Sequence, residues 1–417
     1  MQFLIAMCLL VCGFFASILQ ANPPSSFEII PEDEAATTEK LVAGTQASMN
    51  AALHKLEEKI ESLKKEGQPI AASLRAVRDA HPKSHGCVRG KFKILNDQEL
   101  SSLGYPRNNF KAVRHRLAQG LFAKESSYQA WVRFSNGNAK SQPDYIPDGR
   151  GMAIKIIGVN GQRIELDQVN ENHTQDFLMI NFPQFFVKNV RDYIDFFADT
   201  PKFLASHQEE AKIARGIASQ ITTSPLETQY FSMTPISYGN DAVKYSAIPC
   251  VYAQSTTNIG NLPLAPLIEI LKGLKNPSEL SQHIATLSPR YDGYLREAMQ
   301  EQLKDTKGCF LFLVQFHENQ STEPIEDPTV EWKTKFYPVA RLTLPPQEFS
   351  SPKQDEFCDN LAFTPWHSLQ AHRPLGGVQR ARRVIYGTIS ETRRAFNLKQ
   401  GLTSPDLMVE PTGNESF

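Results

Sequence analysis

Six short runs rich in β-branched and aromatic residues most limit how this chain can fold. Gly, Asp and Asn clusters punctuate them, and runs of this kind are typical of strands. They occupy residues 88–95, 128–136, 151–159, 242–253, 309–317 and 337–344. Two longer segments, residues 185–218 and 263–306, instead read as helical. The pattern predicts an α+β fold, in which a large antiparallel β core carries helical insertions.

The N-terminal stretch has the character of a targeting segment. Residues 3–19 are almost wholly apolar, and Ala16 and Ala21 are candidate cleavage positions. Residues 1–21 are therefore expected to form an export signal peptide. No Lys or Arg precedes the apolar run, and an uncleaved membrane anchor is the less favoured alternative. The expected location is outside the cytoplasm, either periplasmic or secreted.

The remaining flanks differ in composition from the strand-rich region. Residues 22–74 are expected to contain a loose linker followed by an amphipathic helix over 40–66, where apolar residues recur at three- and four-residue spacing. Residues 401–417 are expected to form a flexible tail. The core then comprises residues 75–400.

Charge and cysteine content exclude several classes of function. The chain has 44 basic and 45 acidic residues, a net charge of −1, so no positive field attracts nucleic acid. Four cysteines follow the apolar N-terminal run, and none shows the CxxC spacing of zinc or redox motifs. One disulfide is compatible with export, but the spacing does not select a pair.

A segment near the C-terminus places a phenol between two cations. Arg382 precedes Tyr386 by four residues, and Arg393 follows it by seven, so on a helix the three share one face. Flanking guanidinium groups favour the ionised phenolate, which is a ligand suited to ferric iron. The alternative is an exposed, arginine-rich terminal helix without a ligand.

Four motifs in order resemble those of the catalase-like heme proteins, which include catalases, catalase-related peroxidases and hydroperoxide-rearranging enzymes. The pattern R-x-x-H-x-K occurs at 78–83 and R-F-S at 133–135. The catalase run R-D-P-R-G-F-A-x-K-F becomes PDGRGMAIKI at 147–156, and R-x-x-x-Y occurs at 382–386. The resemblance spans roughly residues 75–400. It implies a catalase-like antiparallel β-barrel core.

The resemblance assigns roles at the iron of a ferric heme b. Tyr386 would be its proximal ligand, as in Tyr-ligated catalase heme. Arg382 would hold Tyr386 as phenolate. His81 would be the distal acid and base that moves a proton during O–O cleavage. Ser135 would orient His81 from behind.

Other residues would hold the heme itself. By the resemblance, Arg78, Arg133 and Arg393 would bind the heme propionates, where a forked guanidinium suits a carboxylate. Tyr193 falls where the family stacks a Phe on the heme. The chain continues only 31 residues beyond Tyr386. We therefore expect neither the C-terminal helical domain of full catalases nor an NADPH site, and a smaller or weaker homo-oligomer.

Two positions in the distal motif leave alternatives open. The family's distal Asn lies four residues after an Asp and three before a Pro. Asn181 here lies five after Asp176 and two before Pro183, and a gapless match would put Ile180 at the functional position. Asn181 is the expected catalytic residue, and capping of a strand end is its alternative role. His85 competes with His81 as the distal histidine.

The function implied by the resemblance is that of a heme-dependent hydroperoxidase. It would reduce or dismutate hydrogen peroxide or an organic hydroperoxide. One alternative is an isomerase or lyase that rearranges fatty-acid hydroperoxides on the same heme. In that relative a Thr precedes the distal His, whereas this chain has Ala80. A third alternative is a non-catalytic heme-binding protein.

Overall fold

The computed structural model describes most of the chain after the apolar N-terminal run. The described residues are 26–71, 74–103, 113–164, 171–220, 222–250, 258–259, 262–263, 292–408 and 410–417. The expected signal peptide and most of the segment 263–306 lie outside them. In the part of the chain so described, no helix is long and apolar enough to cross a membrane.

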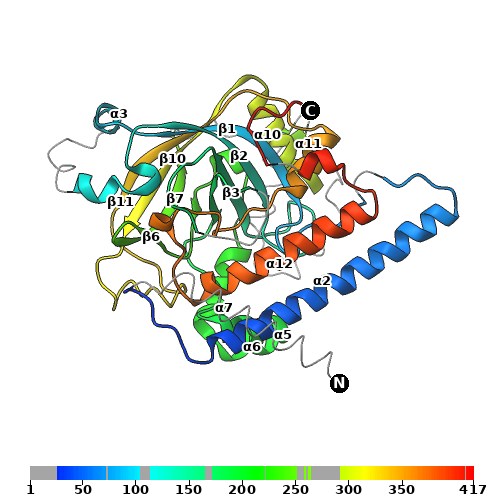
Figure 1. The fold of residues 1–417 in the computed structure, drawn as a ribbon, viewed down its shortest axis with the longest axis horizontal. Coiled ribbons are helices and arrows are strands. Elements are labelled where there is room, and N and C mark those ends of the chain that lie inside the picture. The colour runs from blue at the N-terminus through cyan, green and yellow to red at the C-terminus, as the bar shows by residue number, and fades with distance from the viewer. Residues whose placement is uncertain are drawn as a thin grey trace.

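A closed antiparallel barrel of eight strands forms the core (Figure 1). In spatial order its strands are β10 (Gly308–Phe316), β11 (Phe336–Leu344), β1 (Ser84–Ile94), β2 (Ser127–Asn136), β3 (Arg150–Ile157), β4 (Thr174–Ile180), β5 (Tyr230–Phe231) and β7 (Asp241–Pro249). Pairing of β7 with β10 closes the ring. β6 (Ile236–Tyr238) extends the edge of β7, and β8 (Asn258–Ile259) pairs with β9 (Leu262–Pro263). The predicted α+β class with an antiparallel core is confirmed.

Each of the six predicted runs coincides with a long strand, while β4, β5, β6, β8 and β9 are additions. Alternate residues of a strand point to opposite faces. Inside the barrel, Phe92, Phe177 and Phe312 pack with ring centroids 4.7–6.3 Å apart. The opposite faces of β2, β3 and β4 therefore carry Arg133, Ser135 and their cross-strand neighbours on the outside of the barrel.

Helices cover this outer face. The described helices are α2 (Glu34–Lys65), α3 (Asp97–Ser102), α5 (Val190–Ala198), α6 (Thr200–Ser206), α7 (Gln208–Ala218), α10 (Tyr294–Asp305), α11 (Pro352–Asn360) and α12 (Gly377–Lys399), with short 3₁₀ turns at Gly120–Phe122, Pro225–Glu227, Gln370–His372 and Pro405–Met408. The predicted helical region 185–218 contains α5, α6 and α7. Figure 1 shows α12 lying along the barrel, with α2 outside it.

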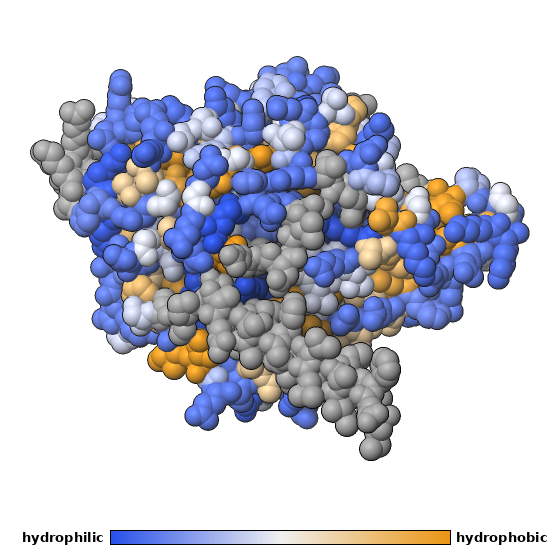
Figure 2. All heavy atoms as spheres, viewed as in Figure 1, coloured by the Kyte–Doolittle hydropathy of each residue, from blue (hydrophilic) through white to orange (hydrophobic). Residues whose placement is uncertain are grey.

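The amphipathic helix α2 uses its apolar side to pack on α12. Leu41 and Met49 form one buried cluster with Ala381, Ile385 and Ile389. The remaining surface of this face of the molecule is mainly hydrophilic, with apolar residues in small separate groups (Figure 2). The expected N-terminal helix therefore supports the helix that carries Tyr386.

The C-terminal segment differs from the expected flexible tail, because its side chains contact the body. Trp131 Nε1 donates to Glu415 Oε2 at 3.2 Å. The ring of Phe417 lies 5.3 Å from that of Phe357 and 6.1 Å from that of Trp131. Aromatic contacts of this kind offset the entropy lost by ordering a chain end.

Two disulfides join the four cysteines that the sequence could not pair. Cys87 of β1 is bonded to Cys358 of α11, and Cys250 is bonded to Cys309 of β10. The first bond ties a barrel strand to the segment that precedes α12. Cys87 is therefore not a free thiol.

Candidate functional site

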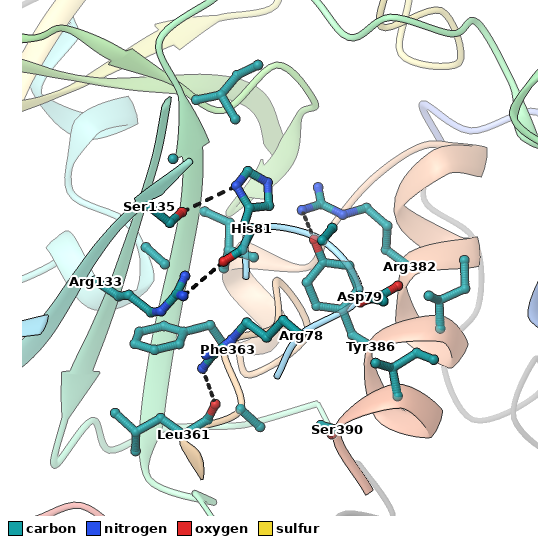
Figure 3. Close-up of a pocket in the computed structure, with 18 of the residues that line it drawn as sticks. Arg78, Asp79, His81, Arg133, Ser135, Leu361, Phe363, Arg382, Tyr386 and Ser390 are labelled. Carbon is teal, nitrogen blue, oxygen red and sulfur yellow. Dashed lines mark hydrogen bonds between the residues drawn. The ribbon is translucent and has the colours of Figure 1, made fainter. Parts of the chain in front are cut away.

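A cavity lies between the outer face of the barrel and α12. It offers about 980 Å³ of space, a volume that includes its opening to solvent. Its wall combines barrel residues (Arg133, Ser135, Gly151, Ala153, Leu178, Ile180), α12 residues (Arg382, Ile385, Tyr386, Ile389, Ser390, Arg393), the segments 78–81 and 361–363, and Met152, Met179, Tyr193 and Met233. Figure 3 shows His81 and the Arg382–Tyr386 pair on facing sides of this space.

The barrel side of the cavity is ordered by strand register. Ser135 of β2 pairs with Gly151 of β3, which pairs with Ile180 of β4. In the next row on the same face, Arg133 pairs with Ala153, which pairs with Leu178. The side chains that line the wall are thus polar on β2, small on β3 and apolar on β4.

Gly151 allows His81 to lie against β3. A Cβ at this glycine would come within 2.7 Å of Ser135 Oγ and 2.8 Å of His81 Nδ1, closer than side chains pack. The backbone of His81 is in the left-handed region with φ +58°, which is uncommon for a residue with a side chain. Such strain is concentrated at functional sites, where the surroundings hold it.

The hydrogen bonds of His81 define its tautomer. Nδ1 lies 2.5 Å from the carbonyl oxygen of Asn136 and 3.3 Å from Ser135 Oγ. A carbonyl only accepts, so Nδ1 carries the proton and Nε2 keeps a free lone pair. Burial lowers the pKa of His81 to about 4, and neighbouring arginines act in the same direction, although the bond to Asn136 opposes them. His81 is therefore a neutral base at pH 7.

On the opposite side, α12 holds the phenol against a guanidinium. Arg382 Nη2 donates to the hydroxyl oxygen of Tyr386 at 2.8 Å, and Nη1 donates to Gln379 Oε1 at 3.2 Å. Burial disfavours the charged guanidinium, but Tyr386 outweighs it and raises the pKa of Arg382. The predicted alignment of Arg382, Tyr386 and Arg393 on one helix face is present, because all three line the cavity.

Three arginines gather at one end of the cavity. Arg78 Nη2 donates to the carbonyl of Leu361 at 2.7 Å, and Arg393 Nη2 donates to the same oxygen at 3.3 Å. Arg133 Nη2 donates to the carbonyl of His81 at 2.9 Å. Within the described part of the chain, the Nε atoms of Arg133 and Arg393 are buried without a hydrogen-bond partner, and neither side chain has an ion pair with a carboxylate.

At this end of the cavity, burial and neighbouring positive charges disfavour the charged form of the arginines. Burial and the neighbouring Arg78 lower the pKa of Arg133 to about 9. Burial, Arg78 and Arg394 lower the pKa of Arg393 well below its usual range. Buried cations without an opposite charge are costly. This end of the cavity therefore suits an anionic ligand that would supply the missing charge.

Tyr193 of α5 also lines the cavity, as expected. Its ring lies 5.1–5.7 Å from those of Phe185, Phe186 and Phe197. Burial, with a smaller contribution from Tyr386, raises the pKa of Tyr193 and keeps it neutral. It can offer a ligand a flat aromatic surface.

The prediction that Asn181 is a catalytic residue of the cavity is corrected by the structure, because Asn181 lies behind the cavity wall and does not line it. Its Oδ1 accepts from the backbone N–H of Arg150 at 2.7 Å, and its own N–H donates to the Arg150 carbonyl at 3.0 Å. It fastens the end of β4 to β3, which is the alternative role. Ile180 lines the cavity in its place, because neighbouring residues on a strand face opposite sides.

His85, the competing distal histidine, is buried away from the cavity. Its Nδ1 lies 3.6 Å from Asp144 Oδ1, and burial together with Arg150 and Lys83 holds the pKa of His85 well below its usual range. Of the two histidines, only His81 lines the cavity.

Sequence reasoning missed the backbone acceptors of the site. The carbonyls of Asn136 and Leu361 position His81, Arg78 and Arg393, yet a carbonyl carries no residue-type signal. Gly151 lies in the motif at 147–156. Glycine is favoured where another group approaches the backbone closely, so this residue was a sequence signal for the close contact.

The side chains fit a heme in three respects. A phenol is available as a single iron ligand. Buried guanidinium groups lack an anion. Gly151 and Ala153 are small residues, so the wall between these two groups leaves room for a ligand. The described residues contain no cluster of three His, Cys, Asp or Glu side chains able to hold a metal ion. In comparisons with known proteins, no family model matches the chain and no curated protein matches it.

Proposed function

We propose that this protein is a catalase-like, heme-dependent hydroperoxidase. The observation that carries the proposal is a neutral imidazole base facing a guanidinium-bound phenol across one cavity. The substrate would be hydrogen peroxide or an organic hydroperoxide, as the sequence motifs imply. A neutral base opposite a metal ligand is the arrangement that acid–base cleavage of a peroxide requires.

The residues that would hold ferric heme b follow from their chemistry. Tyr386 would ligate the iron as phenolate, with Arg382 balancing its charge at 2.8 Å. Arg133 and Arg393 would bind the propionates, and Arg78 would assist them. Tyr193 would pack on the ring. When bound, ferric heme supplies the redox-active iron for two-electron reduction of the O–O bond.

His81 would carry the proton. Its Nε2 takes the proton from the hydroperoxide O–H and returns it to the oxygen that leaves when the O–O bond breaks. Ser135 and the Asn136 carbonyl hold Nδ1–H, which keeps Nε2 in the accepting tautomer. The overall reaction is ROOH + 2H⁺ + 2e⁻ → ROH + H₂O. A phenol or aromatic amine would donate the electrons, or a second hydrogen peroxide would do so with release of O₂.

We also propose that the protein works in an oxidising compartment. Its two disulfides, Cys87–Cys358 and Cys250–Cys309, are of the kind that persists in exported proteins. This agrees with the apolar N-terminal run, which reads as an export signal.

An absorption spectrum tests the iron ligand. The purified protein is loaded with ferric heme, and Tyr386→Phe is compared with the matched variant Tyr193→Phe, which removes a hydroxyl from the same cavity. The wild type and Tyr193→Phe should share a five-coordinate tyrosinate spectrum, and Tyr386→Phe should lose it. An identical spectrum in all three would remove Tyr386 from the coordination of iron.

A second measurement tests the base. His81→Ala should retain heme but lose peroxide turnover by roughly 10²–10⁴-fold, the usual contribution of a general acid–base group. His85→Ala is the control in the same segment. Full turnover by His81→Ala would remove His81 from the mechanism.

A further inference from the structure

The polar partners of His81 all lie on one side of its ring. Ser135 and Asn136 are on β2 and face Nδ1. A Cβ built on Gly151 would lie 3.1 Å from His81 Cε1, so the ring lies directly over β3. On the other side of Gly151, the cross-strand neighbour is Ile180.

Strand register puts the Ile180 side chain on the face of the barrel against which the His81 ring lies. Directly paired residues on antiparallel strands point to the same face, with Cβ atoms about 4.5–5.5 Å apart. Ile180 therefore lies across Gly151 from Ser135 and lines the same cavity as His81. Asn181 does not line the cavity, and its Oδ1 accepts from the Arg150 N–H behind the wall.

The apolar character continues outward from Ile180. Ile180 and Met233 both line the cavity and belong to one buried cluster with Phe185 and Phe203. Phe182 and Ile217 pack on this cluster. The backbone of Met233 is held in the left-handed region at φ +61°. The surroundings thus hold this apolar residue at the cavity edge despite its backbone strain.

Aromatic side chains also extend from the cavity to the exposed surface of α5. Tyr193 lines the cavity, and its ring lies 5.1 Å from that of Phe197. Phe197 is 61% exposed on α5. An apolar substituent attached to a peroxide would find carbon surface from the base outward on this side.

Hydrogen peroxide gains no favourable contact from this apolar wall. Its four polar sites lose water on entry, and the β4 side returns no hydrogen bond, so binding beside Ile180 is penalised. An alkyl or aryl group gains from the same contact, and even one methylene changes discrimination by about tenfold or more.

We propose that the physiological substrate is an organic hydroperoxide with an apolar substituent, and that Ile180 is a specificity-determining residue. This rests on the proposed hydroperoxidase function and specifies its substrate class. The O–O bond of R–O–O–H breaks, and His81 delivers the hydroperoxide proton to the alkoxide oxygen to give R–OH. The second oxygen leaves as water after it takes up two protons, which the phenolic donor releases on oxidation. A phenolic donor supplies the two electrons.

The test compares two substrates with one electron donor. The heme-loaded full chain is assayed with cumene hydroperoxide and with hydrogen peroxide, using guaiacol as donor. The wild type should favour cumene hydroperoxide in kcat/KM by about tenfold or more. Ile180→Asn should shift that ratio toward hydrogen peroxide by about tenfold, whereas Ile180→Leu, which keeps the position apolar, should preserve it.

A binding measurement gives a readout that does not depend on turnover. Calorimetric titration of the heme-loaded protein with cumyl alcohol, the product, should show binding that Ile180→Asn weakens about tenfold and Ile180→Leu retains. Ile180→Thr replaces Ile180→Asn if the latter fails to load heme.

The outcomes separate the two proposals. A wild type that binds heme and prefers hydrogen peroxide overturns the substrate class alone. Cumyl alcohol binding that is equal in Ile180→Asn and the wild type removes Ile180 as its determinant. Failure to bind heme, or turnover of neither hydroperoxide, overturns the proposed function and this inference with it.

Discussion

Helix α12 carries buried arginines in two opposite electrostatic situations. Near its start, Arg380 contacts three carboxylates: Glu34 at 2.6 Å, Glu28 at 2.5 Å and Glu326 at 3.0 Å. Burial disfavours its charge, but the hydrogen bonds to Glu34 and Glu326 outweigh burial and raise the pKa of Arg380. This group joins the N-terminal segment, α12 and the loop before β11.

Near the end of the same helix, Arg393 lies with Arg133 and Arg78 at the cavity. Its guanidinium donates to a carbonyl at 3.3 Å, and burial and like charges lower the pKa of Arg393. Of these three, Arg78 alone forms a described ion pair, with Asp359 at 3.5 Å, which Arg75 shares at 2.9 Å.

This difference between Arg380 and Arg393 distinguishes an arginine that stabilises the fold from one that binds a ligand. A buried cation with matched carboxylates contributes to the fold, and loss of either partner leaves an uncompensated charge. A buried cation that lacks an anion costs stability until a ligand supplies one. Removing Arg380 should therefore harm the free protein, and removing Arg393 should harm the complex.

The largest expected effect is on the paired group. Arg380→Met leaves Glu34 buried without its cation, removes the partner of the half-buried Glu326, and should lower the free energy of unfolding by about 3–5 kcal/mol. Urea denaturation of the heme-free protein measures it. Lys333→Met, which breaks an exposed pair with Glu331 at 2.6 Å, is the control and should cost less than about 1 kcal/mol. Equal losses in the two variants would contradict the comparison.

The next largest effect concerns the disulfide next to the three arginines of the cavity. Arg78 Nη2 donates to the carbonyl of Cys358 at 2.8 Å, next to the disulfide with Cys87. Replacing both cysteines by alanine should cost about 2–4 kcal/mol and also weaken heme binding. The matched control is removal of Cys250–Cys309, which joins the end of β7 to β10. It should lower stability and leave the heme dissociation constant unchanged; a parallel loss of heme affinity would contradict this account.

The barrel was predictable because its strands carry strong local patterns. Each long run of branched and aromatic residues became a strand, and the two-residue period placed Arg133 and Ser135 on one face. Tyr386 reached the cavity because it lies on the long helix α12, whereas His81 lies in the irregular segment before β1 and is held by the Asn136 carbonyl. Pairing of β7 with β10 and the choice of disulfide partners depend on contacts distant in sequence, which no local pattern encodes.

The Asn181 error has a specific physical cause. A one-residue displacement along a strand turns the side chain to the opposite face, so an approximate motif match cannot decide between Ile180 and Asn181. The register of β4 on β3 decides it, since Gly151 pairs with Ile180. The C-terminal tail was mispredicted for a related reason, because the contacts of Phe417 are with Trp131 and Phe357, far away in sequence.

A third prediction tests the unpaired group directly. Arg393→Met removes a buried charge that lacks a carboxylate, so the heme-free protein should be as stable as the wild type or more so. Heme affinity should fall about 10–100-fold, the equivalent of one hydrogen bond to a charged group at about 1.5–3 kcal/mol. Heme titration and urea denaturation of the same samples measure both. Arg380→Met should give the reverse pattern, with lower stability and retained heme affinity.

The smallest expected effect is a shift in pH dependence, because the arginines that line the cavity also act on His81. Its pKa is lowered to about 4 by burial first and then by Arg133, Arg382 and Arg78. Nε2 accepts a proton only while His81 is neutral, so kcat/KM should hold down to about pH 4 and fall below it. Arg133→Met removes a positive neighbour and should move this acid limb upward by less than about one pH unit. Profiles are measured at full heme loading, with Lys333→Met as control; an acid limb that stays in place would show that burial alone keeps His81 neutral.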